Sequence, residues 1–507
     1  MRYLALCGEV KSRAEAIPVL LGIDIGTTSV KGIVIRVEDG GTLIRASQTY
    51  QTMRPQTGWV EQDPRDWTSA VASLWTFMNH ELKEYYLVGV GICSQVNTHV
   101  LVDLAGAPVT PAIVWKDLRA ADEAKVLQRA LAHLTQNSML ESAPLNIDAT
   151  SALARLAWWQ QNDPDMVNRA HRLLLPKDFV VSALTGADVS DPLSAIGLVD
   201  TNGIYSKETL GLLDRSAELL PRLAPFDSVA GYTTGALGLP KGVPVAVGTM
   251  DAWGNVYGSG LRDRSRAMQV AGTSEIVGVL SDQAHPTEGI VSFPPVNKKI
   301  LHAGPTQAGG DAISWFSELV GRTIEDVFIA ASSSTRSDSR VVFLPHLDGE
   351  RAPVWNPDAQ GVWLGLNRTT GFEELALSVL EGVAYSARHV LERCEVAAGG
   401  RVDAIRLSGG AAKSDLWNQI KANVHGRPVE VLSELDTGAR GAALIVGRAI
   451  ELTDDLEKWS SDLAHVRITM EPSASDAARH DQGYEIYRNA YQALEPVFAA
   501  NQGAPHV

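Results

Sequence analysis

A short pattern of two β-rich segments joined by a turn rich in glycine and hydroxyl groups occurs twice in this chain. In the first copy, the apolar segment 19–25 leads into Gly26-Thr27-Thr28-Ser29, and a second β-rich segment follows at 30–37. In the second copy, residues 268–271 lead into Gly272-Thr273-Ser274, and residues 275–280 follow. Short glycine-containing turns between β-rich runs are typical of hairpins. The sequence therefore predicts one hairpin in each half and indicates an internal duplication.

The hairpin setting of these glycines excludes two common nucleotide-binding motifs. Dinucleotide and P-loop signatures place their glycines between a strand and a helix, and no GxxxxGK[ST] segment occurs in the sequence. A hairpin turn still offers backbone N–H groups and hydroxyls to phosphate oxygens, and Asp24 before the first turn is a carboxylate that can hold Mg²⁺ through water. A plain hairpin turn is the alternative. The predicted phosphate-binding residues are Gly26, Thr27 and Thr28 in the first turn and Gly272 and Thr273 in the second.

Length and composition exclude several classes of protein. The 507 residues are 45% hydrophobic and 20% charged, which predicts a folded protein with two large domains. The net charge of -15, without a block rich in lysine and arginine, argues against nucleic-acid or anionic-membrane partners. The three cysteines are dispersed, and no apolar run reaches the ~18 residues of a membrane span, so we expect a cytoplasmic protein.

The remaining segments are predicted from periodicity. Residues 1–17 show no hydrophobic periodicity leading into the first strand. We expect a loose extension there rather than a signal peptide. Helices are predicted over 151–161, 207–220, 373–393 and 483–498. In the last of these, Tyr484, Tyr487, Tyr491 and Leu494 have 3-4-3 spacing, which favours core packing over a ligand site.

Longer motifs carry a resemblance to a known family. Residues 24–29 resemble the first phosphate motif of the superfamily that contains sugar kinases, actin and the Hsp70 chaperones. Residues 361–381 are similar to the longer signature of the FGGY carbohydrate kinases, and shorter matches lie at 58–64, 111–119 and 407–414. Within this family the chain most resembles the xylulokinase branch.

This resemblance implies an α/β fold of two ribonuclease-H-like domains with a cleft between them for ATP, Mg²⁺ and a sugar. The first domain is expected over 18–249, mainly sugar-binding, and the second over 250–507, mainly nucleotide-binding. Asp24 would then be the metal ligand. Asp251, in Gly248-Thr249-Met250-Asp251-Ala252, stands where these kinases carry their catalytic aspartate. A carboxylate there can orient the sugar hydroxyl and accept its proton, whereas a helix cap is the alternative role.

The resemblance also implies where the nucleotide binds. Residues 409–414 lie between a β-rich segment and a predicted helix at 415–424, and glycines there allow close approach of the backbone to a ligand. Polar side chains one turn apart are candidates for adenine or ribose contacts. A plain helix N-terminus is an equal alternative for the turn at Gly309. The predicted nucleotide residues of this half are Gly309, Gly409, Gly410, Ser414 and Asn418.

The predicted sugar loop departs from the xylulokinase pattern Ser-Gly-Gln-Met-His-Gly. Here Gln95 is followed by Val96 in place of Met and Asn97 in place of His. His99 lies two residues further on and is the alternative sugar contact, which requires a shift of the loop. The predicted substrate residues are therefore Gln95, Val96 and Asn97, with Asp251. Trp59 is a further candidate that could stack on the sugar, Glu61 and Gln62 could bind its hydroxyls, and Lys116, Asp117 and Arg119 could line the rim. Arg155, Trp158 and Trp159 are expected to be structural.

The resemblance implies transfer of the γ-phosphoryl group of ATP to a ketopentose, with D-xylulose giving its 5-phosphate. Another sugar, polyol or sugar acid, such as ribulose or gluconate, is the alternative substrate. An Hsp70-like or actin-like ATPase is a rival of another class. Fewer than 100 residues follow the motif at 408–414, which leaves no room for a peptide-binding domain. The expected partner is thus a small sugar, and a homodimer is an open alternative to a monomer.

Overall fold

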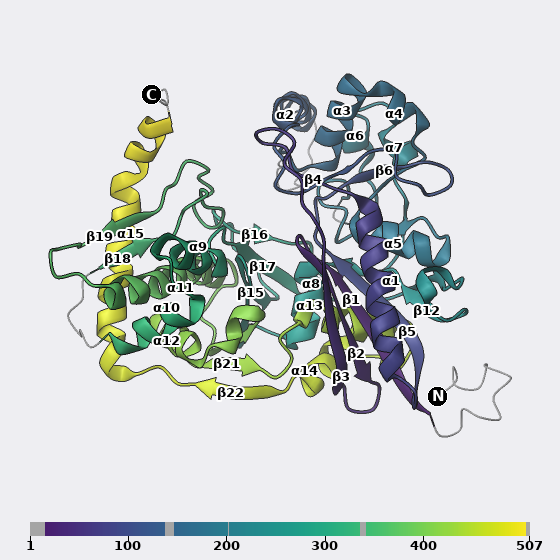
Figure 1. Ribbon diagram of the computed structural model, residues 1–507. Coiled ribbons are helices and arrows are strands. Elements are labelled where there is room, and N and C mark those ends of the chain that lie inside the picture. The colour runs from purple at the N-terminus through teal and green to yellow at the C-terminus, as the bar shows by residue number, and fades with distance from the viewer. Residues whose placement is uncertain (1–15, 137–146, 201, 335–340, 503–507) are drawn as a thin grey trace. The chain divides into compact units, whose positions relative to one another are not determined.

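The computed structural model describes residues 16–136, 147–200, 202–334 and 341–502. The chain forms two compact units (Figure 1). The N-terminal unit comprises Met1–Gly260 and Asp436–Leu463, and the C-terminal unit comprises Leu261–Leu435 and Ala464–Val507. The predicted loose extension lies outside the described residues as far as residue 15, and Ile17 already belongs to the first strand.

The N-terminal unit is built on a sheet of strand order β11-β12-β5-β1-β2-β3. The predicted hairpin is confirmed, because β1 and β2 are antiparallel and pair Ile25 with Val30 across the turn. Strands β5 and β12 continue the sheet parallel to β1, and the short β13 also runs parallel to β5. The strands are β1 (Ile17–Ile25), β2 (Ser29–Arg36), β3 (Thr42–Thr49), β5 (Tyr85–Ser94), β11 (Val229–Tyr232), β12 (Pro244–Ala246) and β13 (Thr249–Met250).

Helices cover both faces of this sheet. On one face, α1 (Pro64–Glu81) packs on β2 and β3, and its apolar stripe joins Leu21 and Ile23 in one core. Asp63 caps α1, and Pro64 fits its first turn, where no N–H partner is needed. Because side chains alternate along a strand, Gly22 points to the other face, where α13 (Thr437–Ala449) packs. Near these helices lie α5 (Pro176–Thr185), α8 (Asp251–Ser259) and α14 (Leu456–Leu463).

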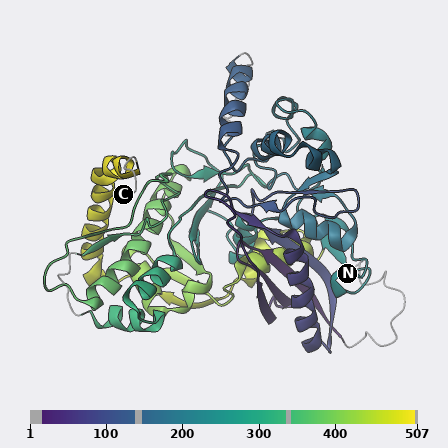
Figure 2. The ribbon, with the colours of Figure 1, turned by 45° about the horizontal axis from the view of Figure 1, so that its top comes forward.

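A separate lobe of the same unit is formed by short elements with their own apolar cluster. Figure 2 shows α2 projecting from this lobe. The helix predicted over 207–220 is wrong as one helix, because Gly211 ends the first segment and Arg215 with positive φ precedes the second. The lobe contains α2 (Ala121–Gln136), α3 (Ala152–Asn162), α4 (Pro164–Arg169), α6 (Lys207–Leu210), α7 (Ser216–Leu219), and the strand pairs β4 (Glu61–Gln62) with β7 (Ala112–Ile113), β6 (Val100–Val102) with β8 (Arg172–Leu174), and β9 (Val189–Ser190) with β10 (Arg222–Leu223).

The C-terminal unit has a sheet of order β16-β17-β15-β14-β20-β21-β22. The second predicted hairpin is confirmed, because β14 and β15 are antiparallel and pair Ala271 with Glu275. Strands β20 and β21 run parallel to β14. The strands are β14 (Arg266–Ala271), β15 (Glu275–Ser281), β16 (Val291–Ser292), β17 (Ile300–Pro305), β20 (Ala404–Ser408), β21 (Val429–Leu432) and β22 (Val466–Met470), with β18 (Val342–Leu344) and β19 (Val362–Leu364) as a separate pair.

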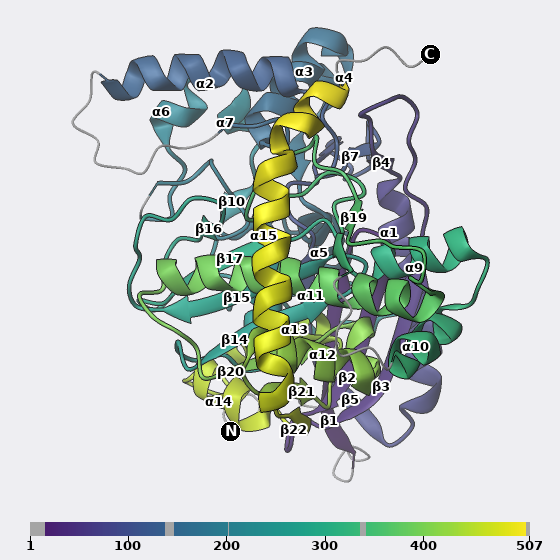
Figure 3. The same ribbon diagram turned by 90° about the vertical axis from the view of Figure 1, so that its left-hand side faces the viewer.

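The helices of this unit bury the predicted aromatic stripe. Figure 3 shows α15 as one long helix beside α11 and α12. Tyr484, Tyr487 and Tyr491 are buried in one apolar cluster with residues of α11, and Leu494 packs against that cluster, so core packing is confirmed. The helices are α9 (Gly310–Val320), α10 (Ile324–Ser333), α11 (Phe372–Ala397), α12 (Asp415–His425) and α15 (Ala474–Gln502).

The two sheets share one arrangement. In each, an antiparallel hairpin is extended on one side by a third antiparallel strand and on the other by two parallel strands and a final antiparallel one. The order β3-β2-β1-β5-β12-β11 thus corresponds to β17-β15-β14-β20-β21-β22. This match supports the internal duplication that the repeated turns indicated.

The division into units differs from the boundary predicted between residues 249 and 250. Helix α8 follows β13 directly and packs in the N-terminal unit, and the late segment Asp436–Leu463 returns to that unit. The physical reason is close packing of α13, whose backbone touches glycines of β1, β5 and α8. A motif search along the chain does not reveal such a return.

Candidate active site

Asp24 and Asp251 lie at the carboxyl ends of two strands, β1 and β13, that both pair with β5 in the N-terminal unit. The parallel pairing of β1 with β5 places Asp24 beside Cys93, and the parallel pairing of β13 with β5 places Thr249 beside the same cysteine. Asp251 follows β13 as the first residue of α8. In open α/β sheets, ligands bind at the carboxyl ends of parallel strands. The structure therefore brings the two predicted carboxylates to one edge where this fold class binds ligands.

Asp24 has a carboxylate oxygen suited to a cation. Its Oδ1 atom is buried and has no hydrogen-bond partner, while Oδ2 lies against the Cα of Gly438 in α13. Burial raises the pKa of Asp24 to about 6, and the nearby charge of Lys31 opposes that increase. Mg²⁺ is typically held by one or two carboxylates plus phosphates and water. Asp24 fits this role, and the described ranges contain no group of three His, Cys, Asp or Glu side chains that would hold a metal alone.

Lys31 and Asp436 are charged neighbours that sequence reasoning missed. Lys31 is directly opposite Asp24 in the β1–β2 register, and its Nζ lies 2.9 Å from Oδ1 of Asp436. The hairpin register alone would have identified Lys31, because a turn centred between Thr27 and Thr28 pairs residues 24 and 31. Asp436 gave no such signal, because it comes from a segment more than 400 residues later.

The first phosphate turn is held from outside by four side chains. Gly26 N donates to Ser29 O at 3.0 Å and closes the turn. The Tyr50 hydroxyl donates to Gly26 O, and Thr52 Oγ1 and Gln62 Nε2 donate to Thr27 O at 3.2 and 2.6 Å. The Trp115 indole donates to Thr27 Oγ1 at 2.9 Å.

Two backbone donors of this turn have no protein acceptor. Among the residues that the structure describes, the N–H groups of Thr27 and Thr28 make no hydrogen bond, and Thr28 is exposed. Because the indole N–H of Trp115 can only donate, the Thr27 hydroxyl accepts from it and keeps its own proton to donate. These groups form the kind of concave donor set that binds phosphate oxygens.

Asp251 begins α8 and is half-exposed. Its Oδ1 accepts from Ala252 N at 2.8 Å, and its carbonyl accepts from Asn255 Nδ2 at 2.9 Å. Asn255 in turn accepts from the Thr437 hydroxyl at 2.6 Å, which ties α8 to α13. Asp251 therefore has a local hydrogen bond in the first turn of α8, whose cap position is Met250, and it is partly accessible to solvent.

The predicted sugar loop is organised by Arg155. This buried guanidinium donates to the carbonyls of Asn97, Ile113 and Val114 and to Nδ1 of His99, the last at 3.0 Å. Burial lowers the pKa of Arg155 to about 9. Because arginine only donates, Nδ1 of His99 carries no proton, and burial together with the Arg155 charge holds the pKa of His99 well below its ordinary value. The structural role expected for Arg155 is thus what the geometry shows.

The side chains of this loop differ in what they can contact. Asn97 has φ = 53°, a left-handed conformation that asparagine adopts more readily than most residues, and its Nδ2 donates to the Thr150 hydroxyl at 3.1 Å. Val96 is half-buried. Gln95 is buried, donates to Gln62 Oε1 at 3.0 Å, and has no partner for its own Oε1. His99 is buried, and its Nδ1 atom is engaged by Arg155.

The predicted rim residues form a closed network. The Arg119 guanidinium lies 3.7 Å from the ring centroid of Trp59 and forms ion pairs with Asp117 and Glu61 at 2.7 and 2.8 Å. Trp59 also meets Trp158 edge-on at 5.3 Å. One face of Trp59 is therefore already covered, and Asp117, fully buried, is a structural residue.

In the C-terminal unit, the backbone of the second predicted phosphate turn, Gly272-Thr273-Ser274, is hydrogen-bonded to the start of α9. Gly310 N and Asp311 N donate to the carbonyls of Gly272 and Thr273 at 2.9 and 3.2 Å. A side chain at Gly309 would overlap Thr273 and Ser274, and one at Gly409 would overlap Ala271 O. The structure thus brings together the predicted residues Gly272, Thr273, Gly309 and Gly409.

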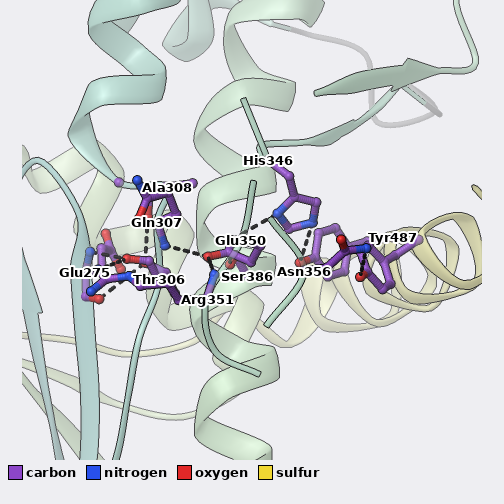
Figure 4. A network of polar contacts seen from close by, with 12 residues as sticks. Glu275, Thr306, Gln307, Ala308, His346, Glu350, Arg351, Asn356, Ser386 and Tyr487 are labelled. Atoms are coloured by element: carbon purple, nitrogen blue, oxygen red, sulfur yellow. Dashed lines mark hydrogen bonds and ion pairs between the residues drawn. The ribbon is translucent and has the colours of Figure 1, made fainter. Parts of the chain in front are cut away.

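A buried polar network fixes the segment that leads to α9 (Figure 4). Glu350 accepts from Gln307 N at 2.5 Å, from Arg351 N at 2.9 Å and from the Ser386 hydroxyl at 3.2 Å, and its other neighbour is His346 at 3.0 Å. Arg351 also donates to Thr306 O at 2.6 Å. The segment before Gly309 is therefore fixed by side chains from α11 and from the loop after β18.

Ser414 and Asn418 have structural roles in the described geometry. Ser414 caps α12 by accepting from Trp417 N at 3.3 Å. Asn418 is fully buried and donates to Ala412 O at 2.9 Å, while its Oδ1 atom is buried and has no hydrogen-bond partner. Gly410, in contrast, is exposed, and a side chain there would meet nothing within 4 Å. Of this segment, Gly410 has the open surroundings that a ligand contact requires.

Comparisons with known proteins agree with this geometry. Residues 19–258 match the N-terminal domain, and residues 267–450 the C-terminal domain, of the FGGY family of carbohydrate kinases. The chain is 29% identical over 503 residues to a xylulose kinase of Escherichia coli, covering 94% of this chain and 100% of that protein.

Solved structures share the fold. A xylulose kinase from Rhodospirillum rubrum superposes with a TM-score of 0.79 at 25% identity, covering 95% of this chain and 100% of that one. A gluconate kinase from Lactobacillus acidophilus superposes with a TM-score of 0.85 at 22% identity, covering 96% and 100%. The chain belongs to the FGGY family of carbohydrate kinases. The predicted two-domain α/β class is confirmed, and no helix in the described ranges has the length and apolar composition to cross a membrane.

Proposed function

We propose that this carbohydrate kinase transfers the γ-phosphoryl group of ATP to D-xylulose. The observation that carries the proposal is the pair of carboxylates, Asp24 and Asp251, at the carboxyl ends of the two strands that pair with β5 on either side, beside the phosphate turn. The xylulose kinases among its full-length relatives support the choice of sugar. Phosphoryl transfer depends on positioning and charge neutralisation, which these residues can provide.

In the proposed reaction, each group has one task. The free N–H groups of Thr27 and Thr28 bind phosphate oxygens, and in the other unit the exposed Gly410 and the turn at Gly272 and Thr273 contribute to nucleotide binding. Asp24 holds Mg²⁺, which supplies charge neutralisation when bound. Asp251 orients the acceptor hydroxyl and takes its proton.

The sugar loop favours a neutral acceptor over a sugar acid. Gln95 and Asn97 have amide side chains, and the Arg155 guanidinium is used by loop carbonyls and His99. Arg119 is paired with Asp117 and Glu61. Neither arginine is directed toward a ligand carboxylate, which argues for xylulose or ribulose over gluconate.

ADP release over a panel of D-xylulose, D-ribulose, D-gluconate and glycerol tests the proposal. We expect the highest kcat/KM with D-xylulose and little ADP release without a sugar. Equal ADP release with and without sugars would indicate an ATPase instead. A preference for gluconate would contradict the argument from the sugar loop.

Asp24→Ala tests the metal role in the same assay. Removing the carboxylate should raise the Mg²⁺ concentration required for half-maximal turnover, because the remaining ligands are phosphates and water. An unchanged Mg²⁺ dependence would remove Asp24 from this role.

A further inference from the structure

The side-chain amide of Gln62 connects the predicted sugar loop to the phosphate turn within the N-terminal unit. Gln62 is fully buried. Its Nε2 donates to Thr27 O at 2.6 Å and to Thr52 Oγ1 at 2.9 Å. Its Oε1 accepts from Gln95 Nε2 at 3.0 Å and from Trp67 Nε1 at 3.2 Å. All four hydrogen-bonding positions of the amide are therefore used, and Gln62 has none left for a ligand.

The chemistry of its neighbours fixes which way each amide points. The indole of Trp67 can only donate, so it faces the oxygen of Gln62, and the carbonyl of Thr27 can only accept, so it faces the nitrogen. Because the Gln62 oxygen accepts, Gln95 must present its nitrogen there. The Oε1 atom of Gln95 then points away from Gln62.

That oxygen of Gln95 is buried and has no hydrogen-bond partner. Buried acceptors in native structures almost always have one, and an unsatisfied one is unfavourable. Gln95 also belongs to the loop predicted to contact the sugar, and its backbone N–H donates to Ile25 O at 2.8 Å, directly before the phosphate turn. A sugar hydroxyl is a donor of the kind that this oxygen lacks.

We propose that Gln62 is a positioning residue through which sugar binding at Gln95 strengthens the hold on the phosphate turn. The inference rests on the proposed function. A hydroxyl donated to Gln95 polarises that amide, and hydrogen bonds in a buried chain strengthen one another. The effect passes through Gln62 to the carbonyl of Thr27, whose own hydroxyl and neighbouring N–H groups face the phosphates. Sugar and nucleotide then raise each other's affinity.

The coupling is measured by calorimetry with a non-hydrolysable ATP analogue, β,γ-imido-ATP with Mg²⁺, in the absence and presence of saturating D-xylulose. For the wild type we expect D-xylulose to tighten analogue binding at least about 5-fold. Gln62→Met keeps the length of the side chain and removes the amide, so this factor should fall to near 1. By reciprocity, the analogue should then no longer tighten D-xylulose binding.

Two further variants separate coupling from stability. Trp67→Phe removes the hydrogen bond from the indole to Gln62 Oε1, which connects Gln62 to neither the sugar loop nor the phosphate turn. This variant should have a lower melting temperature, but D-xylulose should still tighten analogue binding by the wild-type factor. Thr52→Val is a milder change if Gln62→Met does not fold. It removes one donor to Thr27 O and one acceptor of Gln62, and should reduce the factor partially.

The outcomes discriminate between this inference and the proposed function. A wild-type factor retained in Gln62→Met, or in Thr52→Val where Gln62→Met does not fold, overturns the inference. So does a wild type in which D-xylulose binds without changing analogue affinity, and in that case the proposed function stands. If another sugar of the panel is the substrate, it replaces D-xylulose in the same measurement. Absence of sugar-dependent ADP release with the whole panel overturns both.

Discussion

Asp24 and Asp251 lie at the same edge of the sheet but in different local environments, and the environments suit different tasks. Asp24 lies at the end of β1, pressed against Gly438, with one oxygen inaccessible to water and a pKa raised by burial. Asp251 is half-exposed at a helix N-terminus. A buried carboxylate oxygen without donors suits a cation, whereas an accessible carboxylate suits a mobile hydroxyl.

Asp251→Asn should lower sugar-dependent turnover at least about 10²-fold, the usual scale for loss of a positioned acid or base. The amide keeps the volume and can still accept from Ala252 N, so the fold and analogue binding should persist. Steady-state ADP release and calorimetry check both parts. Near wild-type turnover would exclude Asp251 as the catalytic residue.

His99→Gln should reduce the loss of stability in acid. The folded state holds the pKa of His99 well below that of the unfolded chain, so the unfolded chain binds more protons below about pH 6.5. The stability contribution of neutral His99 is thus present above that pH and is lost as the pH falls. Between pH 6.5 and 5 the variant should therefore lose less stability than the wild type.

Urea unfolding at several pH values provides this measurement for His99. His80→Gln, on the exposed surface of α1, is the control for loss of a histidine. If His99→Gln instead weakens sugar binding without changing the pH profile, His99 is a sugar contact and its structural role is wrong.

At the scale of elements, α13 determines how closely the active-site strands and helices approach. Its backbone touches Gly22 of β1, Gly91 of β5 and Gly258 of α8, and a side chain at any of the three would overlap a carbonyl of α13. Gly441 of α13 likewise lies against the Gly254 carbonyl of α8. Glycines on both sides therefore allow α13 to approach β1, β5 and α8 more closely than larger residues would.

Gly441→Ala should destabilise the protein although alanine favours helices. The propensity gain is about 1 kcal/mol, whereas overpacking against backbone costs about 3 kcal/mol. The free energy of unfolding should fall by about 2 kcal/mol. Gly371→Ala is the matched control, because its methyl would meet only the mobile end of Glu373, at 3.0 Å. An unchanged or higher urea midpoint for Gly441→Ala would contradict the packing argument.

At the scale of the whole molecule, the N-terminal unit is discontinuous in sequence. Its sheet is complete by residue 250, yet one face is covered by α13 from Asp436–Leu463, and α14 of the same segment packs on α8 and α13. Without that segment, apolar residues and close-packed glycines of β1 and β5 would face water. The unit therefore depends on the late segment for its fold.

A fragment of residues 16–260 should accordingly be poorly ordered, with weak near-ultraviolet circular dichroism and strong binding of a hydrophobic dye. The same fragment joined by a flexible linker to residues 436–463 should recover a cooperative thermal transition, because the linked helix restores the missing face. A cooperative transition of equal midpoint in both fragments would show that the late segment is dispensable.

Much of the fold could be predicted because its signals are local. The hairpins at Gly26 and Gly272, the helix at α15 and its buried tyrosine stripe follow from periodicity and turn chemistry over fewer than 20 residues. The single helix predicted over 207–220 is wrong for a reason that is also local. The composition of this segment suggested one continuous helix, but Gly211 ends the first helical segment. Lys31 was also within reach, through the register of the first hairpin.

What the sequence determined by itself is the class of fold and the family, because the signals for both reside in contiguous motifs. Only the tertiary structure decided that Asn418 and His99 are buried, that Gln62 is saturated by partners from four segments, and that Asp436–Leu463 belongs with the N-terminal unit. The physical reason is that burial and hydrogen-bond saturation depend on packing between segments far apart in the chain. That packing leaves no periodic trace in any one of them.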